Sequence, residues 1–249
     1  MMMNENIKSF DNKSDQYAQF RPRYPMEFYN HLLSLKEIKE KLWDCGCGNG
    51  QVSIDLVNFF DEIYATDISE NQIRNGFIHK KIQYLVEPSE RTSFGNSFFD
   101  IICVAQALHW FDLEKFFTEA DRVLKPNGIL ACFGYGFFSI NNEIDKIINE
   151  HLLSVVDEYW SDGNRLIMSG FKSVKFPFQE VISPKLNLVQ KWSLSALLDY
   201  LDTWSAVKIY NNKFKTSVTQ NLKKELNPFW VDIETRDVIF DFYSFIRKK

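Results

Sequence analysis

The stretch Leu42-Trp43-Asp44-Cys45-Gly46-Cys47-Gly48-Asn49-Gly50 decides the fold of this chain. An apolar start followed by glycine at every second position predicts a β-strand that ends in a tight turn and opens a helix. Glycine suits this turn because a Cβ would hinder both positive φ values and close approach of a ligand to the backbone. Residues 51–60 carry apolar side chains at helical spacing, so the free N–H groups of the first helical turn should face the glycines. The turn is therefore a candidate ligand site, although a sharp turn without a ligand explains the same residues.

Asp67 narrows the choice between these two interpretations. It ends the next short apolar run, residues 63–66, about twenty residues beyond the glycines, where an acid is placed to hydrogen-bond a ribose diol. The glycine turn and the acid together predict an adenosine-containing cofactor.

Spacing and charge indicate which cofactor this is. The dinucleotide fingerprint G-x-G-x-x-G would place its third glycine at Gln51, whereas the chain has Gly50, one position early. Asp44 lies just before the turn, where a pyrophosphate would meet a like charge. A ligand with an ammonium group and no phosphate fits better, which favours S-adenosylmethionine.

Several stretches resemble known proteins. Residues 44–50 and 65–69 look like motif I and the following acidic motif of class I S-adenosylmethionine-dependent methyltransferases. Other stretches are similar to one small-molecule branch of that family, the trans-aconitate methyltransferase-like proteins, and together they span nearly the whole chain: residues 17–25, 105–111, 122–128 and 200–207. The resemblance implies methyl transfer from S-adenosylmethionine to a small molecule.

Strands alternate with helices up to residue 134, which predicts an α/β fold with a mostly parallel sheet and right-handed crossovers. We expect a single methyltransferase domain, residues 1–249, with a Rossmann-like doubly wound sheet of seven strands whose last strand is antiparallel. Residues 1–134 would form the cofactor-binding core with an N-terminal lid. Residues of about 135–235 would form cap helices with a sixth strand at 171–178, and residues 236–249 would form the last strand.

The carboxyl ends of parallel strands meet at one edge of such a sheet, so the strand tips should surround the cofactor. The resemblance adds Tyr17 and Arg21 from the lid, and Ser89 and Glu90 near the adenine; a packed arm and a surface loop are the alternatives for these two segments. The predicted cofactor-binding residues are Tyr17, Arg21, Asp44, Gly46, Cys47, Gly48, Asp67, Ile68, Ser89, Glu90, Ala105, Gln106 and Trp110.

The resemblance also points to a small carboxylic acid that is methylated on oxygen. A desolvated carboxylate needs a paired cation, and the planar fork of arginine suits that task. Arg21 and Arg165 are the candidates for the substrate clamp, with surface ion pairs as the alternative for both. His109 follows a strand tip and is predicted to orient the acceptor, with a purely structural histidine as the alternative.

Composition excludes several classes of protein. The net charge is −4, with 29 Lys and Arg against 33 Asp and Glu, so a nucleic acid is not an expected partner. No apolar run approaches the ~20 residues that a membrane span needs. Four cysteines in strand-like contexts lack zinc spacing, so we expect no metal and a cytoplasmic, reducing location. The oligomeric state is left open.

Two other functions fit parts of this pattern. A nicotinamide-dependent oxidoreductase would share the adenosine site, but the displaced glycine and Asp44 count against it. A non-catalytic protein that binds S-adenosylmethionine for regulation would need the same pocket residues. Cofactor binding and product formation distinguish these alternatives from an enzyme.

Overall fold

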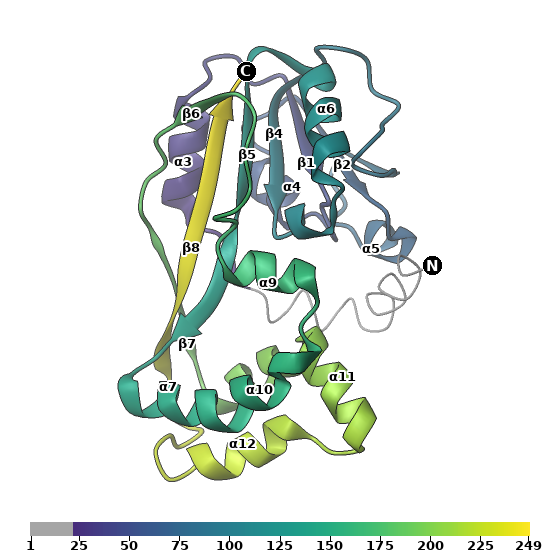
Figure 1. Cartoon of the computed structure of the whole chain (residues 1–249). Helices are drawn as coiled ribbons and strands as arrows, with labels where there is room; N and C mark the ends of the chain where they lie inside the picture. Colours follow the sequence, from purple (N-terminus) through teal and green to yellow (C-terminus); the bar gives the residue numbers. More distant parts are fainter. Residues whose placement is uncertain (1–21) are drawn as a thin grey trace.

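The computed structural model describes residues 22–249, which form one mixed sheet with helices on both faces and a helical cap (Figure 1). The order of strands across the sheet is β3-β2-β1-β4-β5-β8-β6, with β7 paired to β8. The strands are β1 (Lys41–Cys45), β2 (Glu62–Asp67), β3 (Ile82–Val86), β4 (Phe99–Ala105), β5 (Leu124–Ser139), β6 (Gln179–Val181), β7 (Asn187–Trp192) and β8 (Arg236–Lys248). Strands β1 to β5 are parallel and β8 is antiparallel to β5, which confirms the predicted fold class.

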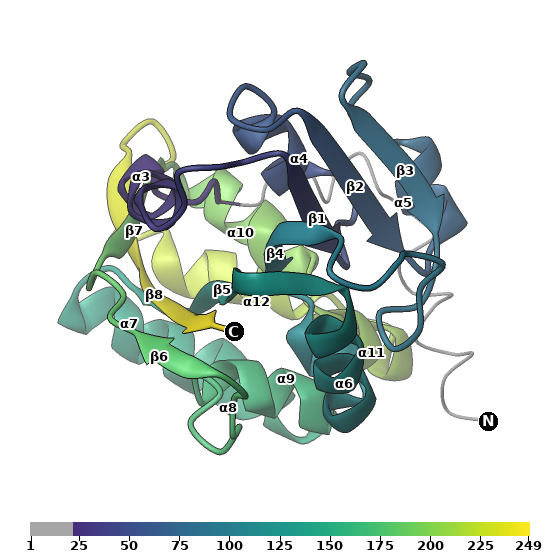
Figure 2. The ribbon, with the colours of Figure 1, turned by 90° about the horizontal axis from the view of Figure 1, so that it is seen from above.

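Side chains of the parallel strands alternate between two apolar layers. Leu42 of β1 lies in the layer under α3 and α4, and its neighbour Trp43 lies in the layer under α6; both are fully buried. Figure 2 shows α3 and α6 on opposite sides of the sheet. The helices that cover the core are α3 (Met26–Ser34), α4 (Gln51–Leu56), α5 (Glu70–Arg74) and α6 (Leu113–Val123).

Side chains cap two of the core helices, and the sequence predicts the first of these caps, because Ser69 is a favoured N-cap residue with Gln72 three positions on. Ser69 Oγ accepts a hydrogen bond from Gln72 N and begins α5, and Asp112 Oδ1 accepts one from Lys115 N and begins α6. Such caps satisfy N–H groups that have no partner inside the helix. Both helices therefore start at fixed points beside the carboxyl edge of the sheet.

Strands β5 and β8 extend beyond β1 to β4 and lead into the cap (Figure 1). Their pairing runs from Ile129 opposite Lys248 to Ser139 opposite Ile239, with an irregularity between Tyr135 and Phe138. The cap segments are α7 (Asn142–Ile148), a π-helical turn (Asn149–Leu153), α8 (Ser154–Val156), α9 (Asp162–Met168), α10 (Leu194–Asp202), α11 (Ser205–Phe214) and α12 (Val218–Leu226). Within residues 22–249, no helix combines the length and the apolar character required to traverse a bilayer.

The predicted sixth strand at 171–178 is wrong. That segment is irregular, with positive φ at Phe171 and Phe178, and the short strand β6 begins only at Gln179. Its alternating rings pack onto side chains of β8 instead, since the Phe176 ring stacks on Phe245 at 4.5 Å between centroids. The alternation of apolar side chains in this segment therefore reflects packing of the segment against β8 and not a strand.

Residues 192–210 carry apolar side chains at helical spacing, which predicts one long amphipathic helix, but the structure differs. This segment divides into α10 and α11 at Trp204, whose backbone is extended, with φ of −67° and ψ of 134°. Residues 187–192, for which no strand is expected from the sequence, form β7 along the outer part of β8. A short edge strand of mixed polarity has little sequence signal of its own.

Candidate functional site

A cavity of about 310 Å³ opens at the carboxyl ends of β1 to β4, where the sequence predicts the cofactor. It is lined by Tyr24, Asp44, Gly46, Cys47, Gly48, Asn49, Gln51, Val52, Asp67, Ile68, Ser69, Gln72, Glu87, Pro88, Ser89, Glu90, Ala105, Gln106, Ala107, Trp110, Phe111 and Tyr135. Four of these are carboxylates, and none of the described lining residues is a lysine, arginine or histidine. The wall is therefore suited to a ligand that carries positive charge.

The three glycines of the turn have different physical roles. All have positive φ, but a Cβ on Gly46 would lie 2.5 Å from Ala107 Cβ, and one on Gly50 would lie 2.2 Å from Tyr84 Oη. A Cβ on Gly48 would meet only Gln72 Oε1, at 3.8 Å. Gly46 and Gly50 are thus required by packing within the protein, whereas Gly48 leaves its backbone open to the cavity.

Asp67 is connected directly to this turn. Its Oδ2 accepts a hydrogen bond of 2.9 Å from Gly48 N, and its Oδ1 accepts one of 2.8 Å from Ser69 N. Burial raises the pKa of Asp67, and the backbone hydrogen bonds oppose that rise. The carboxylate is held at the cavity wall with acceptor capacity left for a ligand hydroxyl, since each oxygen can accept more than one hydrogen bond.

The two carboxylate oxygens of Asp44 differ in their hydrogen bonds. Its Oδ2 accepts hydrogen bonds from Ser53 N at 3.0 Å and Ser53 Oγ at 2.7 Å, which anchors the start of α4. Its Oδ1 is buried and meets no hydrogen-bond donor in the described part of the chain. Burial raises the pKa of Asp44 to about 7, and Asp67 and Asp55 add to the rise, while the bonds from Ser53 oppose it. A buried carboxylate oxygen in this state is suited to pair with a cationic group of a ligand.

Gln106 stands at the tip of β4 with a positive φ of 53°. Its Nε2 donates to Tyr135 O at 3.0 Å, and its Oε1 accepts from Tyr243 Oη at 3.2 Å. A Cβ on Gly134 would lie 2.5 Å from that Oε1, so the close fit needs glycine. The side chain of Gln106 thus connects β4 with β5 and β8 at the cavity wall.

The structure brings together all the predicted cofactor residues that it describes. Tyr17 and Arg21 lie outside the described residues. The others, which all line the cavity, are Asp44, Gly46, Cys47, Gly48, Asp67, Ile68, Ser89, Glu90, Ala105, Gln106 and Trp110.

The two described residues predicted to meet the substrate, His109 and Arg165, are not among the lining residues. His109 packs against α9, since a Cβ on Gly163 would lie 2.8 Å from His109 O and 3.4 Å from its ring. Arg165 is exposed and bonds to Asp157 through Nη1, 3.3 Å from Oδ1, and through Nη2, 2.7 Å from the backbone O. The surface ion pair considered for Arg165 is present.

Other lining residues were not predicted. Most are sequence neighbours of predicted ones and could have been found by extending each motif along its turn or helix, as with Asn49, Gln51, Ser69 and Gln72. Tyr135 has no such signal, and the resemblance of residues 17–25 assigns no role to Tyr24. Both tyrosines reach the cavity through tertiary packing, with ring centroids 6.3 Å apart.

Comparisons with known proteins agree with this geometry. Residues 43–132 match the family described as methyltransferase domain. A solved structure described as a type II methyltransferase from Anaeromyxobacter dehalogenans is 30% identical, with a TM-score of 0.84 over 92% of this chain and 97% of that one. The chain belongs to the class I S-adenosylmethionine-dependent methyltransferases. S-adenosylmethionine is therefore its cofactor, as the glycine spacing and Asp44 predict.

Two other relatives of this methyltransferase are named in the same way. A Dictyostelium discoideum protein named as a methyltransferase is 29% identical over 96% of both chains. A Saccharomyces cerevisiae protein named as an S-adenosylmethionine-dependent methyltransferase is 28% identical over 51% of this chain and 46% of its own length. The family assignment favours methyl transfer over the nicotinamide alternative.

Proposed function

We propose that this methyltransferase binds S-adenosylmethionine in the cavity at the ends of β1 to β4 and methylates a small molecule. One observation carries the proposal: the buried Oδ1 of Asp44 meets no hydrogen-bond donor in the described part of the chain, and it lies beside a turn whose Gly48 lines the cavity. In this arrangement Asp44 pairs with the ammonium of the methionine part, and Asp67 accepts a hydrogen bond from the ribose. Residues 87–90 then border the adenine, and Gln106 and Trp110 border the sulfonium end.

Bound S-adenosylmethionine supplies an electrophilic methyl group on a sulfonium. The bond that forms joins the acceptor atom to that methyl carbon, and the bond that breaks is the carbon–sulfur bond, whose electron pair stays on sulfur in S-adenosylhomocysteine. The residues of the chain have to align the two reactants, and such alignment is worth several kcal/mol of the barrier. Exclusion of water from the cavity by the two bound reactants would also help, because charge is dispersed in the transition state.

We further propose, on the resemblance to trans-aconitate methyltransferase-like proteins, that the acceptor is a small carboxylic acid. The acidic cavity wall makes a cationic clamp necessary, because unpaired like charges in a desolvated site are unfavourable. Arg165 is engaged by Asp157 away from the lining residues, so the clamp is assigned to Arg21. His109 would then act on the acceptor only through neighbouring residues.

The test of the proposed activity is S-adenosylhomocysteine formation with a library of small acids, amines, phenols and thiols. With S-adenosylmethionine saturating, we expect turnover with at least one acid, at a rate that is flat from about pH 6 to 8 because carboxylates are ionised well below that range. Arg21→Ala should lower the rate sharply, and Arg165→Ala should leave it unchanged. Cofactor binding without product from any acceptor would favour the regulatory alternative, and a rate that climbs through the phenol or thiol range would exclude the acid.

Small molecules, rather than nucleic acids or membranes, remain the proposed partners. The carboxylates of the cavity wall and the net charge of −4 support this proposal, since a phosphate backbone would be repelled.

A further inference from the structure

Glu119 and Arg122 form a pair on α6 that does not line the cavity. Arg122 Nη2 donates to Glu119 Oε1 at 2.6 Å and Arg122 Nε donates to Oε2 at 2.8 Å, which gives a two-pronged ion pair. Glu119 is only 6% exposed. Burial alone would raise its pKa, but the bonds from Arg122 and Thr92 outweigh burial and lower it, so both partners stay charged.

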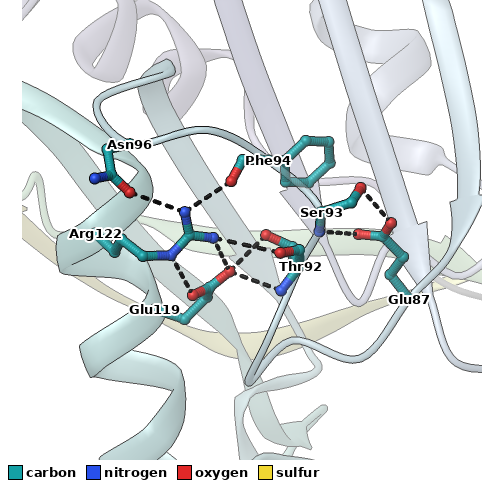
Figure 3. Close-up of polar contacts among 7 residues, drawn as sticks. All are labelled: Glu87, Thr92, Ser93, Phe94, Asn96, Glu119 and Arg122. Atoms are coloured by element: carbon teal, nitrogen blue, oxygen red, sulfur yellow. Dashed lines mark hydrogen bonds and ion pairs between the residues drawn. The ribbon is translucent and has the colours of Figure 1, made fainter.

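The pair holds the backbone of the segment that follows β3 (Figure 3). Glu119 Oε1 accepts hydrogen bonds from Thr92 N at 2.7 Å and Thr92 Oγ1 at 2.5 Å. Arg122 Nη1 donates to Phe94 O at 2.7 Å and to Asn96 Oδ1 at 3.1 Å. Two charged side chains thus bind an irregular segment that has no strand partner along residues 92–96.

The same segment forms one wall of the cavity at its other end. Its first four residues, 87–90, line the cavity. Glu87 accepts hydrogen bonds from Ser93 N at 3.2 Å and Ser93 Oγ at 2.6 Å, and Ser93 lies between Thr92 and Phe94, which the pair binds (Figure 3). A continuous set of hydrogen bonds therefore leads from α6 to the cavity wall.

Helix α6 supports this wall at a second point. Asp112 N, at the cap of α6, donates to Glu90 Oε1 at 2.9 Å. The 3₁₀ turn just before α6, Leu108–Trp110, carries Trp110, which lines the cavity together with Phe111. The start of α6 is thus joined to two parts of the wall, by a hydrogen bond to Glu90 and by the chain that leads from Trp110.

We propose that Glu119 and Arg122 are positioning residues for the cofactor: they hold residues 87–94 on α6 and so set the affinity for the adenosine half without touching it. This inference rests on the proposed placement of the adenine beside residues 87–90. A bidentate arginine–carboxylate pair is suited to the task because its planar geometry orients both partners.

The test uses the conservative variant Arg122→Lys, which keeps the charge and loses the planar fork. Ser93→Ala is a second variant that removes only the side-chain bond to Glu87. Asp121→Asn is the matched control, because Asp121 also lies on α6 but pairs with Lys249, with Oδ1 3.1 Å from Nζ, rather than with the segment after β3. Calorimetry measures binding of S-adenosylhomocysteine and of 5′-methylthioadenosine, which lacks the amino-acid half.

We expect Arg122→Lys to weaken both ligands by the same factor, about five- to tenfold, and Ser93→Ala to weaken both by about two- to threefold. Amide hydrogen exchange should quicken at residues 89–94, and Asp121→Asn should change neither readout. Unchanged affinities in a folded Arg122→Lys variant, with only the melting temperature lowered, would show a purely structural pair and overturn the inference. Wild-type protein that binds neither ligand would instead overturn the proposed function, and the inference with it.

Discussion

The backbone N–H of Gly48 donates a 2.9 Å hydrogen bond to the side chain of Asp67. This bond joins the glycine turn after β1 to the acid that ends β2, and it places both at the cavity wall. The two residues recognised separately in the sequence therefore form one unit. Because the acid supports the turn as well as facing the ligand, its replacement should affect both.

Asp67→Ala should weaken S-adenosylmethionine binding by about 1–3 kcal/mol, the amount expected for loss of a hydrogen bond to a ligand hydroxyl. Calorimetry at 25 °C measures the change. Asp61→Ala removes an exposed acid at the start of the same strand region and serves as the control. Unchanged affinity in Asp67→Ala would remove Asp67 from the cofactor site.

Asp44→Asn keeps the size of the side chain and removes the charge that is proposed to meet the ammonium group. We expect S-adenosylmethionine to bind at least tenfold more weakly, whereas adenosine, which has no ammonium, should bind as before. The two affinities are compared by calorimetry on the same protein preparation. Equal losses for both ligands would mean that Asp44 only anchors Ser53 and the start of α4.

The free energy of unfolding should depend on pH because burial raises the pKa of Asp44. Its pKa is raised to about 7 from an ordinary value of 3.8, so between these pH values the folded ligand-free protein holds a proton that the unfolded chain has released. The free energy of unfolding should therefore fall as pH rises through this window, by at most about 1.4 kcal/mol per pH unit for this one group. Asp67, whose pKa is also raised, contributes in the same direction.

Thermal unfolding from pH 5 to 8 tests this prediction, with Asp44→Asn showing a shallower slope than the wild type. Binding of the cofactor should favour the ionised form of Asp44 over the protonated form, because the cofactor's ammonium pairs with the charged carboxylate. Calorimetry below pH 7 in two buffers of different ionisation enthalpy should then detect proton release in the wild type and less of it in Asp44→Asn. An identical slope and identical proton release in both proteins would contradict a raised pKa at Asp44.

The three glycines of the turn should respond differently to alanine. Gly50→Ala should destabilise the fold strongly, because the new Cβ would lie 2.2 Å from Tyr84 Oη, and Tyr84→Phe should restore part of the loss. Gly48→Ala should cost only about 1–2 kcal/mol of stability, from its positive φ, but should weaken cofactor binding. Melting temperatures and affinities measured together separate the two effects. Similar stability losses at both positions would refute the distinction.

The sequence predicts the parts of the site whose residues are close together along the chain. Asp44, Gly48 and Asp67 lie at the ends of consecutive strands, and parallel pairing brings such ends to one edge. The adjoining Ser69 cap is also predicted correctly. These features depend on local backbone geometry, so a local pattern is sufficient to find them.

Features that depend on distant contacts could not be predicted in this way. Tyr24 reaches the cavity only because its ring packs on Phe133, 4.8 Å away between centroids and more than a hundred residues along the chain. The error at residues 171–178 has a similar cause, since the rings there are ordered by β8 rather than by strand pairing of their own. The position of Arg165 was decided by Asp157, a partner that no motif indicates.

The irregularity in the β5–β8 ladder has a mechanical consequence. Regular hydrogen-bonded strands resist bending, whereas a bulge is a compliant point at which a strand changes direction. The irregular pairing begins at Tyr135, which is also part of the cavity wall, and the cap helices follow beyond it along the chain. A tilt of the cap would bend the two strands at this irregularity and would displace Tyr135. A movement of the cap would therefore change the shape of the wall that surrounds the cofactor.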